Sequence, residues 1–353
     1  MRCGPLMRLL SRNHIACTPR NLIRIVFLLQ SSCWSSLFSR IEQARFGAAL
    51  ARTPIPLDPV FIVGHWRTGS TLLHQLLVQD PEMTAPTLFQ VALPEHFLVS
   101  YRFYKPLLTS LMGSTRPMDN VKIGMNEPQE DEYAFFRLTT HSPLEHLIFP
   151  RKQEYFLKEA PFLPSGEDLT RWESCMTDFF RKLHFASGRR IVSKNPFNSF
   201  RIPQLIKLFP EARFIHIVRH PFAVVPSTTH LWRVVQKQNI LNRNSCTPEA
   251  EEISLFLLQM METIQEEFLQ LPSHRQAVVL YEDLEQDPVG CLQTLYGRLE
   301  LPFSNAFERN LSCYLATLAG YRKNVYSLSE NEKKLIGSIM YLQMERYGYT
   351  ECS

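Results

Sequence analysis

The sequence has no closely spaced pair of cysteines and no sequence motif for a metal site. Its eight cysteines lie singly along the 353 residues, with no C-x-x-C arrangement. This scatter argues against a disulfide framework and a structural zinc site, and it indicates a reducing, cytoplasmic compartment. His141 and His146 do not have the H-E-x-x-H spacing. We therefore expect no bound metal.

Strong net charge is also lacking. The formal net charge is +4, with 45% hydrophobic and 20% charged residues, a composition typical of a soluble globular protein with a substantial core. A charge this small suits an anionic ligand but gives no indication of nucleic-acid binding. Nothing in the sequence determines the oligomeric state.

Acidic residues are nearly absent from the first 51 residues, where Glu42 is the only one against seven arginines. The apolar run 21–38 is interrupted by Arg24, Gln30 and serines, so it falls short of the roughly 20 apolar residues of a membrane span. An arginine-rich, acid-poor segment is also typical of an organelle transit peptide. We favour an amphipathic helix that packs on the domain or lies on an anionic membrane surface, because a helical pattern continues into a proline-marked linker.

Predicted strands and helices alternate after this N-terminal arm. In the segment 248–272, apolar residues from Ile253 to Phe268 have helical spacing, and Ser329 with Glu332 has capping-box spacing. We predict a three-layer α/β/α sandwich with a central parallel sheet, in which ligands bind at the carboxyl ends of the strands. Residues 1–52 would form the arm and 53–353 a single domain. The predicted strands are apolar runs rich in β-branched residues, at 59–64, 189–194, 212–220 and 276–283.

A glycine-rich loop follows the first predicted strand. It has the glycine spacing of a Walker phosphate loop, but Ser70 stands where the Walker lysine would be. Two glycines let backbone N–H groups face an anion at the N-terminus of the next helix, and Arg67 adds a planar cation. We expect this loop to bind a terminal 5′-phosphate rather than a triphosphate with magnesium. Its residues are Gly64, His65, Trp66, Arg67, Thr68, Gly69, Ser70 and Thr71.

A second anion site is predicted after the strand 212–220. Arg219 closes this apolar strand, and Ser227 lies two turns into the helix that follows. A charged residue at the end of a buried strand is seldom only structural. We therefore expect both side chains to converge on another phosphate.

The two patterns, R-x-G-[ST]-T and R-x7-S, resemble the nucleotide-binding motifs of the sulfotransferase superfamily. The segment 192–221, which begins V-S-K-N-P-F, resembles the tyrosylprotein and heparan sulfotransferase-like branch of this superfamily. The E-P-x-E-D-E pattern at 127–132 resembles the related bacterial-type sulfotransferase family proteins. The resemblance extends from about residue 59 to residue 349. It implies 3′-phosphoadenosine 5′-phosphosulfate (PAPS) as the co-substrate, with no metal, because the two phosphates of PAPS match the two anion sites.

The resemblance also implies a role for each of these residues. Arg67 would stabilise charge on the leaving 5′-phosphate, and Lys194 would hold the sulfonate. Arg219 and Ser227 would bind the 3′-phosphate. A C-terminal loop would close over that phosphate with three residues, Tyr321, Arg322 and Lys323.

The acceptor and the general base are less well specified. The acceptor would carry a hydroxyl group, and carbohydrate, lipid, phenol and peptide all stay open; the aromatic-rich and proline-rich region 83–140 would form its pocket. The sequence has no carboxylate where the tyrosylprotein enzymes carry their glutamate. We rank Glu130 first as the base, Glu127 second, Asp131 third and His65 as an outside candidate. Glu130 and Asp131 would occupy the first turn of a helix that follows Pro128.

Two other functions fit parts of the sequence. An ATP-dependent kinase would use Glu282 or Asp283 as a magnesium ligand after the last predicted strand, but the loop lysine is absent. A non-catalytic nucleotide-binding protein at a membrane surface would explain the basic arm. It would leave four residues unexplained: Arg67, Lys194, Arg219 and Ser227.

Overall fold

The computed structural model describes residues 1–111, 124–150, 157, 162–241, 247–318 and 326–349. The chain forms two compact units. Unit 1 comprises Met1–Pro56, Ala85–Ile191 and Val235–Cys246, and unit 2 comprises Leu57–Thr84, Val192–Val234 and Thr247–Ser353. The prediction of an arm at 1–52 and a domain at 53–353 stays a prediction.

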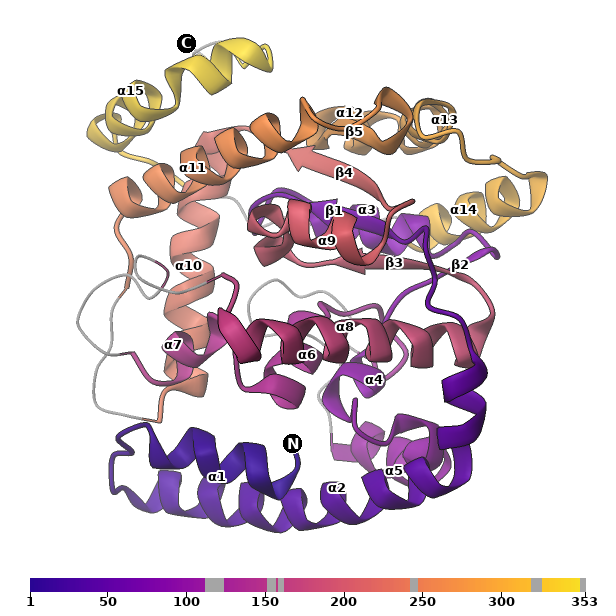
Figure 1. Cartoon of the computed structure of the whole chain (residues 1–353). Coiled ribbons are helices and arrows are strands. Elements are labelled where there is room, and N and C mark those ends of the chain that lie inside the picture. The colour runs from indigo at the N-terminus through magenta and orange to yellow at the C-terminus, as the bar shows by residue number, and fades with distance from the viewer. Residues whose placement is uncertain (112–123, 151–156, 158–161, 242–246, 319–325, 350–353) are drawn as a thin grey trace. The chain divides into compact units, whose positions relative to one another are not determined.

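A five-stranded sheet forms the centre of unit 2 (Figure 1). Its strand order is β2-β3-β1-β4-β5. β1 pairs in parallel with β3 and with β4, and β4 pairs in parallel with β5. The four predicted strands are therefore confirmed, and the two-residue β2 is an addition. The strands are β1 (Val60–Val63), β2 (Met83–Thr84), β3 (Arg190–Lys194), β4 (Arg213–Val218) and β5 (Gln276–Leu280).

Both faces of this sheet are covered by apolar side chains. Along β4, Ile215 and Ile217 join the core on one face, whereas Phe214 stacks on Phe61 on the other, with ring centroids 5.4 Å apart. Alternate residues of a strand point to opposite faces, so apolar residues at successive positions require a helical layer on each side. This arrangement is the predicted three-layer α/β/α sandwich.

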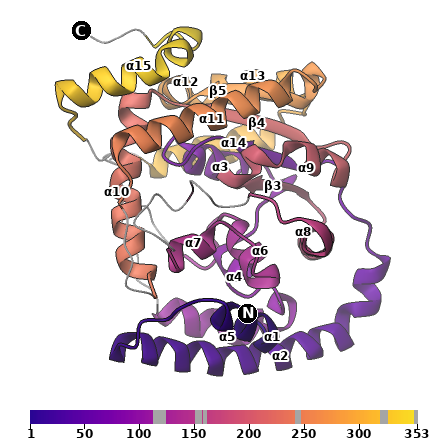
Figure 2. The same cartoon turned by 60° about the vertical axis from the view of Figure 1, so that its left-hand side comes forward.

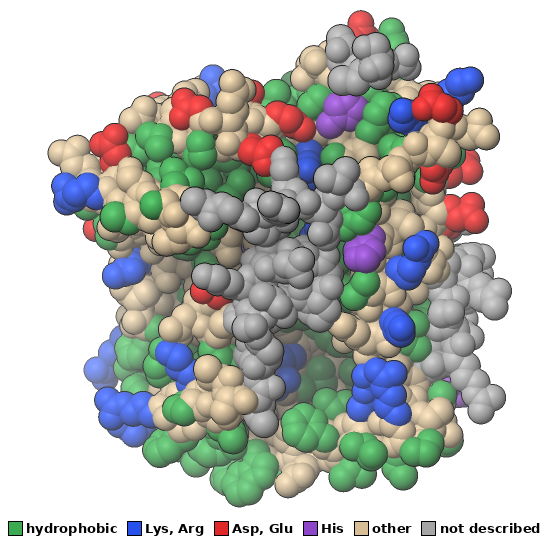
Figure 3. Space-filling model, turned by 180° about the vertical axis from the view of Figure 1, so that it is seen from behind, with side chains coloured by type: hydrophobic (Ala, Val, Ile, Leu, Met, Phe, Trp, Pro, Cys, Tyr) green, Lys and Arg blue, Asp and Glu red, His purple; other side chains and the backbone are tan. Residues whose placement is uncertain are grey.

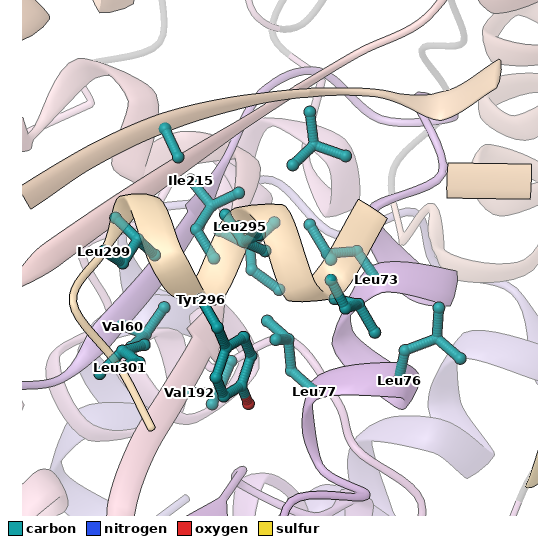
Figure 4. Close-up of a cluster of buried hydrophobic side chains, with 14 of the residues drawn as sticks. Val60, Leu73, Leu76, Leu77, Val192, Ile215, Leu295, Tyr296, Leu299 and Leu301 are labelled. Carbon is teal, nitrogen blue, oxygen red and sulfur yellow. The ribbon is translucent and has the colours of Figure 1, made fainter. Parts of the chain in front are cut away.

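One helical layer consists of α3 (Ser70–Leu77), α13 (Pro288–Arg298) and α14 (Asn305–Thr317). Figure 4 shows side chains of Val60, Val192 and Ile215 from the strands together with leucines of α3 and α13. Tyr296 of α13 lies in the same cluster, and its hydroxyl donates a hydrogen bond to Asp80 Oδ2 at 2.9 Å. Burial of such side chains contributes about 1.5–3 kcal/mol each, and this core holds α3 against the sheet.

The other layer contains α11 and α15, which lie side by side (Figures 1 and 2). α15 begins with the predicted capping box between Ser329 and Glu332. The helices of unit 2 are α3 (Ser70–Leu77), α9 (Ile202–Leu208), α10 (Pro221–Asn239), α11 (Ala250–Phe268), α12 (Tyr281–Gln286), α13 (Pro288–Arg298), α14 (Asn305–Thr317) and α15 (Glu330–Arg346), with 3-10 turns η1 (Pro196–Phe200) and η2 (Ser273–Arg275).

Unit 1 is mainly helical in the residues that the structure describes. The predicted N-terminal helix is present as one continuous element, α2, with Thr18 as its N-cap. Glu42 of α2 accepts hydrogen bonds from Leu98 N–H and Val99 N–H in the first turn of α5 and pairs with Lys182 of α8. The helices are α1 (Cys3–Ser11), α2 (Pro19–Arg52), α4 (Leu88–Ala92), α5 (Phe97–Leu111), α6 (Glu132–Thr139), α7 (Leu144–Ile148) and α8 (Gly166–Ser187).

Candidate active site

The predicted phosphate loop connects β1, the central strand, with α3. Gly64 has φ +127°, and a Cβ there would lie 2.7 Å from the carbonyl oxygen of Ile217, so only glycine fits. Gly69 has φ +92° and is the N-cap of α3. Because glycine has no capping side chain, the first N–H groups of α3 are left for another acceptor, the usual basis of anion binding at a helix N-terminus.

Arg67 connects the loop with the second predicted anion site. Its Nε donates a hydrogen bond to Ser227 Oγ of α10 at 2.8 Å. Its carbonyl oxygen accepts one from Arg219 Nη1 at 3.1 Å, directly after β4. The guanidinium of Arg219 lies 4.2 Å from the ring centroid of Tyr281. The structure therefore brings Arg67, Arg219 and Ser227 together. Their binding of phosphate stays a prediction.

The backbone at Arg67 is also unusual. Its φ is +69°, which is uncommon for a residue with a Cβ. A residue held in the left-handed region costs on the order of 1–3 kcal/mol and persists where its surroundings fix it, often at a functional site. Here the bonds to Ser227 and Arg219 fix Arg67 from its side chain and from its carbonyl group.

His65 and Thr68 stabilise the inside of the loop. Thr68 Oγ1 donates to the carbonyl oxygen of His65 at 2.7 Å, and His65 Nδ1 lies 2.8 Å from the carbonyl oxygen of Trp66. Burial lowers the pKa of His65 to about 4, so the ring is neutral near pH 7. A group with so low a pKa is a poor proton acceptor, which weakens His65 as a candidate base.

Trp66 anchors the loop in an aromatic cluster. Its ring lies 4.9 Å from Phe197, 5.1 Å from Trp232 and 6.3 Å from Phe256, measured between ring centroids. The first two contacts are edge-on, a favoured aromatic geometry. Trp66 thus has a packing role within unit 2 that its position in a glycine-rich loop did not indicate.

Lys194 is the last residue of β3 and lies in register with Ile62 of β1. Its side chain is buried. Burial, together with the charge of Lys194, lowers the pKa of the His74 imidazole to about 3. Lys194 and the loop therefore follow adjacent strands, which is the predicted arrangement at the carboxyl edge of the sheet.

Contacts made by three residues in this region were not predicted. Ser199 Oγ accepts a hydrogen bond from the N–H of Gly64 at 3.0 Å and holds the start of the loop. The ring of Tyr281 occupies the space that a side chain at position 69 would need. Glu282 accepts hydrogen bonds from His220 N–H at 3.1 Å and from Tyr349 O–H at 2.7 Å. The phosphate loop motif gave no signal for these residues because they are distant in sequence.

The two leading candidate bases, Glu127 and Glu130, belong to unit 1. The prediction that Glu130 and Asp131 occupy a first helical turn is wrong, because α6 begins at Glu132, with Asp131 as its N-cap. Pro128 instead forms an isolated antiparallel bridge with Thr87, which delays the start of the helix. Both glutamates thus lie in the connection before α6, and neither is fully buried. Their catalytic role stays a prediction.

The predicted closing loop lies outside the described residues. These exclude 319–325, which contain Tyr321, Arg322 and Lys323. Their contribution to 3′-phosphate binding stays a prediction. The remaining phosphate-loop residues, Ser70 and Thr71, are the first two residues of α3.

These elements lie at the carboxyl ends of parallel strands in an α/β sheet, where the sequence predicts a nucleotide-phosphate site. The family model described as Sulfotransferase family matches residues 59–305. The chain belongs to the sulfotransferase family and is a sulfotransferase enzyme, as the motifs predict.

Two curated sulfotransferases are similar in sequence to nearly the whole chain. The omega-hydroxy-beta-dihydromenaquinone-9 sulfotransferases Stf3 of Mycobacterium bovis and Mycobacterium tuberculosis are each 33% identical over 346 residues, or 97% of this chain and 88% of the relative. Among solved structures, sulfotransferase STF9 from Mycobacterium avium has a TM-score of 0.71 at 17% identity, covering 93% of this chain and 86% of that one. Sulfotransferase STF1 from Mycobacterium tuberculosis has a TM-score of 0.63 at 16% identity, covering 95% and 91%. At these identities the two structures show a shared fold.

Proposed function

We propose that this sulfotransferase uses PAPS and transfers the sulfonate group to a hydroxyl group of an apolar acceptor. The observation that carries the proposal is the pair of contacts that Arg67 makes with Ser227 and Arg219. These contacts join a helix N-terminus to two guanidinium groups in one region. PAPS presents a phosphate at each end of its ribose, and two adjacent cationic positions suit such a ligand.

The residues predicted for the site take the roles that this chemistry requires. The bond between sulfur and the 5′-phosphate oxygen breaks as sulfur bonds to the acceptor oxygen. Arg67 and the first N–H groups of α3 stabilise the charge that grows on the leaving phosphate. Lys194 neutralises the sulfonate oxygens, while Arg219 and Ser227 bind the 3′-phosphate. Glu130, or Glu127, accepts the hydroxyl proton of the acceptor.

An apolar acceptor with a terminal hydroxyl group is favoured by the curated relatives. Their name specifies omega-hydroxy-beta-dihydromenaquinone-9, a lipid, as the molecule they sulfonate. The region 83–140 of this chain, expected to form the acceptor pocket, contains buried Phe89, Phe135 and Phe136. We therefore propose an apolar acceptor with a terminal hydroxyl group for this chain, and we do not propose that particular molecule.

A kinase is disfavoured by the position of two acidic residues. Both side-chain oxygens of Glu282 accept hydrogen bonds from Tyr349 and from the backbone of His220. Asp283 lines a pocket together with residues of β5 and α13. A kinase would need one of these carboxylates as a magnesium ligand at the phosphates.

Calorimetry and a transfer assay test this proposal. We expect adenosine 3′,5′-bisphosphate to bind more tightly than ATP, and turnover to be independent of added magnesium. Sulfonate from labelled PAPS should be transferred to a long-chain ω-hydroxy isoprenoid in preference to a sugar, a phenol or a peptide. Preferential ATP binding, or turnover that requires magnesium, would contradict the proposal.

Variants separate the roles of the individual residues. Arg67→Ala should lower kcat/KM, and the fall should correspond to a loss of about 2–4 kcal/mol in transition-state stabilisation. Either Glu130→Gln or Glu127→Gln should reduce turnover by roughly a hundredfold while nucleotide affinity is preserved. If both glutamine variants turn over normally and His65→Ala is inactive, the base lies in the loop instead.

A further inference from the structure

The N-terminal helix α2 has an inverted distribution of polar and apolar side chains. A surface helix normally buries its apolar stripe and exposes its polar face. In α2 the fully buried residues are polar: Asn21, Ser32, Ser35 and Glu42. The hydrophobic residues of this helix lie mostly outside, as described below.

Specific hydrogen bonds hold the polar face of α2 against unit 1. Asn21 Nδ2 donates to the carbonyl oxygens of Ala16 and Leu241, at 2.9 Å each. Ser35 Oγ lies 3.3 Å from Nε2 of His96. With the contacts of Glu42 to α5 and α8, these bonds determine which side of α2 faces inward. The orientation therefore does not depend on burial of an apolar stripe.

The outward face of α2 is apolar along most of its length. Ile23, Phe27, Trp34, Leu37 and Ile41 recur at helical spacing, and Ile23 and Phe27 are 71% and 68% exposed. Helix α5 of the same unit adds a further group of exposed side chains, and Phe103 there is 73% exposed. Figure 3 shows hydrophobic side chains gathered over α2 and α5, at the bottom of the view. We call this surface the apolar face of unit 1: Leu22, Ile23, Val26, Phe27, Trp34, Leu37 and Ile41 of α2 with Tyr101, Phe103 and Leu107 of α5.

Basic residues accompany this face, and acidic residues do not. Helices α1, α2 and α5 contain one acidic residue, Glu42, which is buried and paired with Lys182. Exposed cations on these helices are Arg8, Arg20, Arg40, Arg45, Arg52 and Arg102. An apolar surface bordered by uncompensated arginines is complementary to the acyl chains and anionic headgroups of a bilayer.

We propose that the apolar face of unit 1 docks in the plane of an anionic lipid membrane, with α2 lying along the surface rather than across the bilayer. This inference rests on unit 1 alone and does not depend on the identity of the acceptor. The exposed aromatic and aliphatic side chains enter the boundary between headgroups and acyl chains. The arginines contact lipid phosphates.

Two other arrangements of this face are disfavoured by the contacts described. Among the described residues, α2 is the one helix long and apolar enough to span a membrane by length and composition. Spanning would remove Asn21, Ser35 and Glu42 from their hydrogen-bond partners and place them in hydrocarbon. A symmetric dimer through this face would bring two sets of arginines together without acidic partners, which is unfavourable.

Tryptophan fluorescence gives a test that requires only one conservative substitution in the apolar face. The chain has four tryptophans; Trp34 is 51% exposed on α2, whereas Trp66, Trp172 and Trp232 are buried. Vesicles of phosphatidylcholine and phosphatidylglycerol with brominated acyl chains should quench the Trp34 emission. The Trp34→Phe variant should show almost no quenching. Absence of quenching in the wild-type chain, or equal quenching in Trp34→Phe, would overturn the proposal.

Co-sedimentation with vesicles measures the contribution of each component. Ile23→Glu with Phe27→Glu should lower the partition coefficient at least tenfold, and Phe103→Glu alone should lower it severalfold. Arg40→Gln and Arg45→Gln should each lower it roughly fivefold at low salt, and by less at high salt. The matched control is Leu342→Glu on α15, which is 70% exposed on unit 2 and should leave partitioning unchanged.

Three outcomes would contradict docking in the membrane plane. Equal partitioning of the Ile23/Phe27 and Leu342 variants would show that the face does not contact lipid. Resistance of the wild-type protein to release by alkaline carbonate would show a spanning helix. A dimer in light scattering that Phe103→Glu dissociates would assign the face to a second copy. Binding of adenosine 3′,5′-bisphosphate by every variant would show that unit 2 is folded. If the proposed function is wrong, the wild-type chain will not bind this nucleotide, and the vesicle measurements will still test docking.

Discussion

Replacement of Gly69 by alanine should disrupt the phosphate loop more than any ordinary Gly→Ala change. A Cβ at this position would lie 2.1 Å from Cδ2 and 2.7 Å from Cε2 of Tyr281. In addition, φ at Gly69 is +92°, and an L-residue in a left-handed conformation costs roughly 1–2 kcal/mol. Overpacking adds about 1–3 kcal/mol. We therefore expect a loss of about 2–5 kcal/mol in the free energy of unfolding.

A control in the same unit isolates the steric part of this effect. Gly348 also has a positive φ, +72°, but a Cβ there would meet no atom within 4 Å. Gly348→Ala should therefore cost only the conformational part, about 1–2 kcal/mol. Because both variants change the unfolded chain in the same way, their difference reports the contact between position 69 and Tyr281.

Urea unfolding and calorimetry with adenosine 3′,5′-bisphosphate provide the measurements. Gly69→Ala should also weaken nucleotide affinity at least tenfold, since the N-terminus of α3 must shift, whereas Gly348→Ala should not. Adding Tyr281→Ala to Gly69→Ala should recover about 1–3 kcal/mol relative to additivity. If Gly69→Ala is as stable as Gly348→Ala and binds nucleotide normally, the close approach of the loop to Tyr281 is refuted.

Three further predictions concern the second anion site, the core and acid stability. Arg219→Ala should weaken adenosine bisphosphate binding roughly tenfold or more in calorimetry, because it removes a charge-assisted contact; an unchanged affinity would remove Arg219 from the site. Leu295→Ala should lower the free energy of unfolding by about 2–5 kcal/mol in urea titrations, since the side chain is buried in the core of Figure 4; a loss below about 1 kcal/mol would contradict that packing. Burial lowers the pKa of His65 to about 4 and those of His74 and His216 to about 3, from 6.5. Below pH 6.5 the unfolded chain therefore binds more protons than the folded one, and stability should fall with pH by up to about 1.4 kcal/mol per unit for each histidine. Equal stability at pH 7 and pH 5 would refute this.

The parts of the fold that were predicted from the sequence depend on local patterns. The strand that ends at Val63, the loop glycines and the capping box of Ser329 are each specified by a few neighbouring residues. The start of α6 was misplaced by two residues because Pro128 pairs with Thr87, a contact between segments that a local pattern does not contain.

The orientation of α2 illustrates a second limit of the sequence. Its pattern shows that apolar and polar residues lie on different faces, but not which face the protein covers. Polar contacts to partners distant in sequence, such as Leu241 and Lys182, determine that the polar face is inside. From its sequence alone, α2 would be predicted to bury its apolar face, because surface helices usually do so.

We expect Arg67 to take the place of the Walker lysine in this loop. A lysine reaches the phosphates as a single flexible charge, whereas Arg67 is fixed at both its carbonyl group and its guanidinium group by residues that follow β4. The two anion sites, predicted from separate motifs, are therefore one connected network. Loss of Arg219 also removes a contact that positions Arg67, so effects on nucleotide binding and on turnover are not independent. The losses in kcat/KM for Arg67→Ala and Arg219→Ala should consequently be less than additive in the double variant, as is usual for residues that act as a unit.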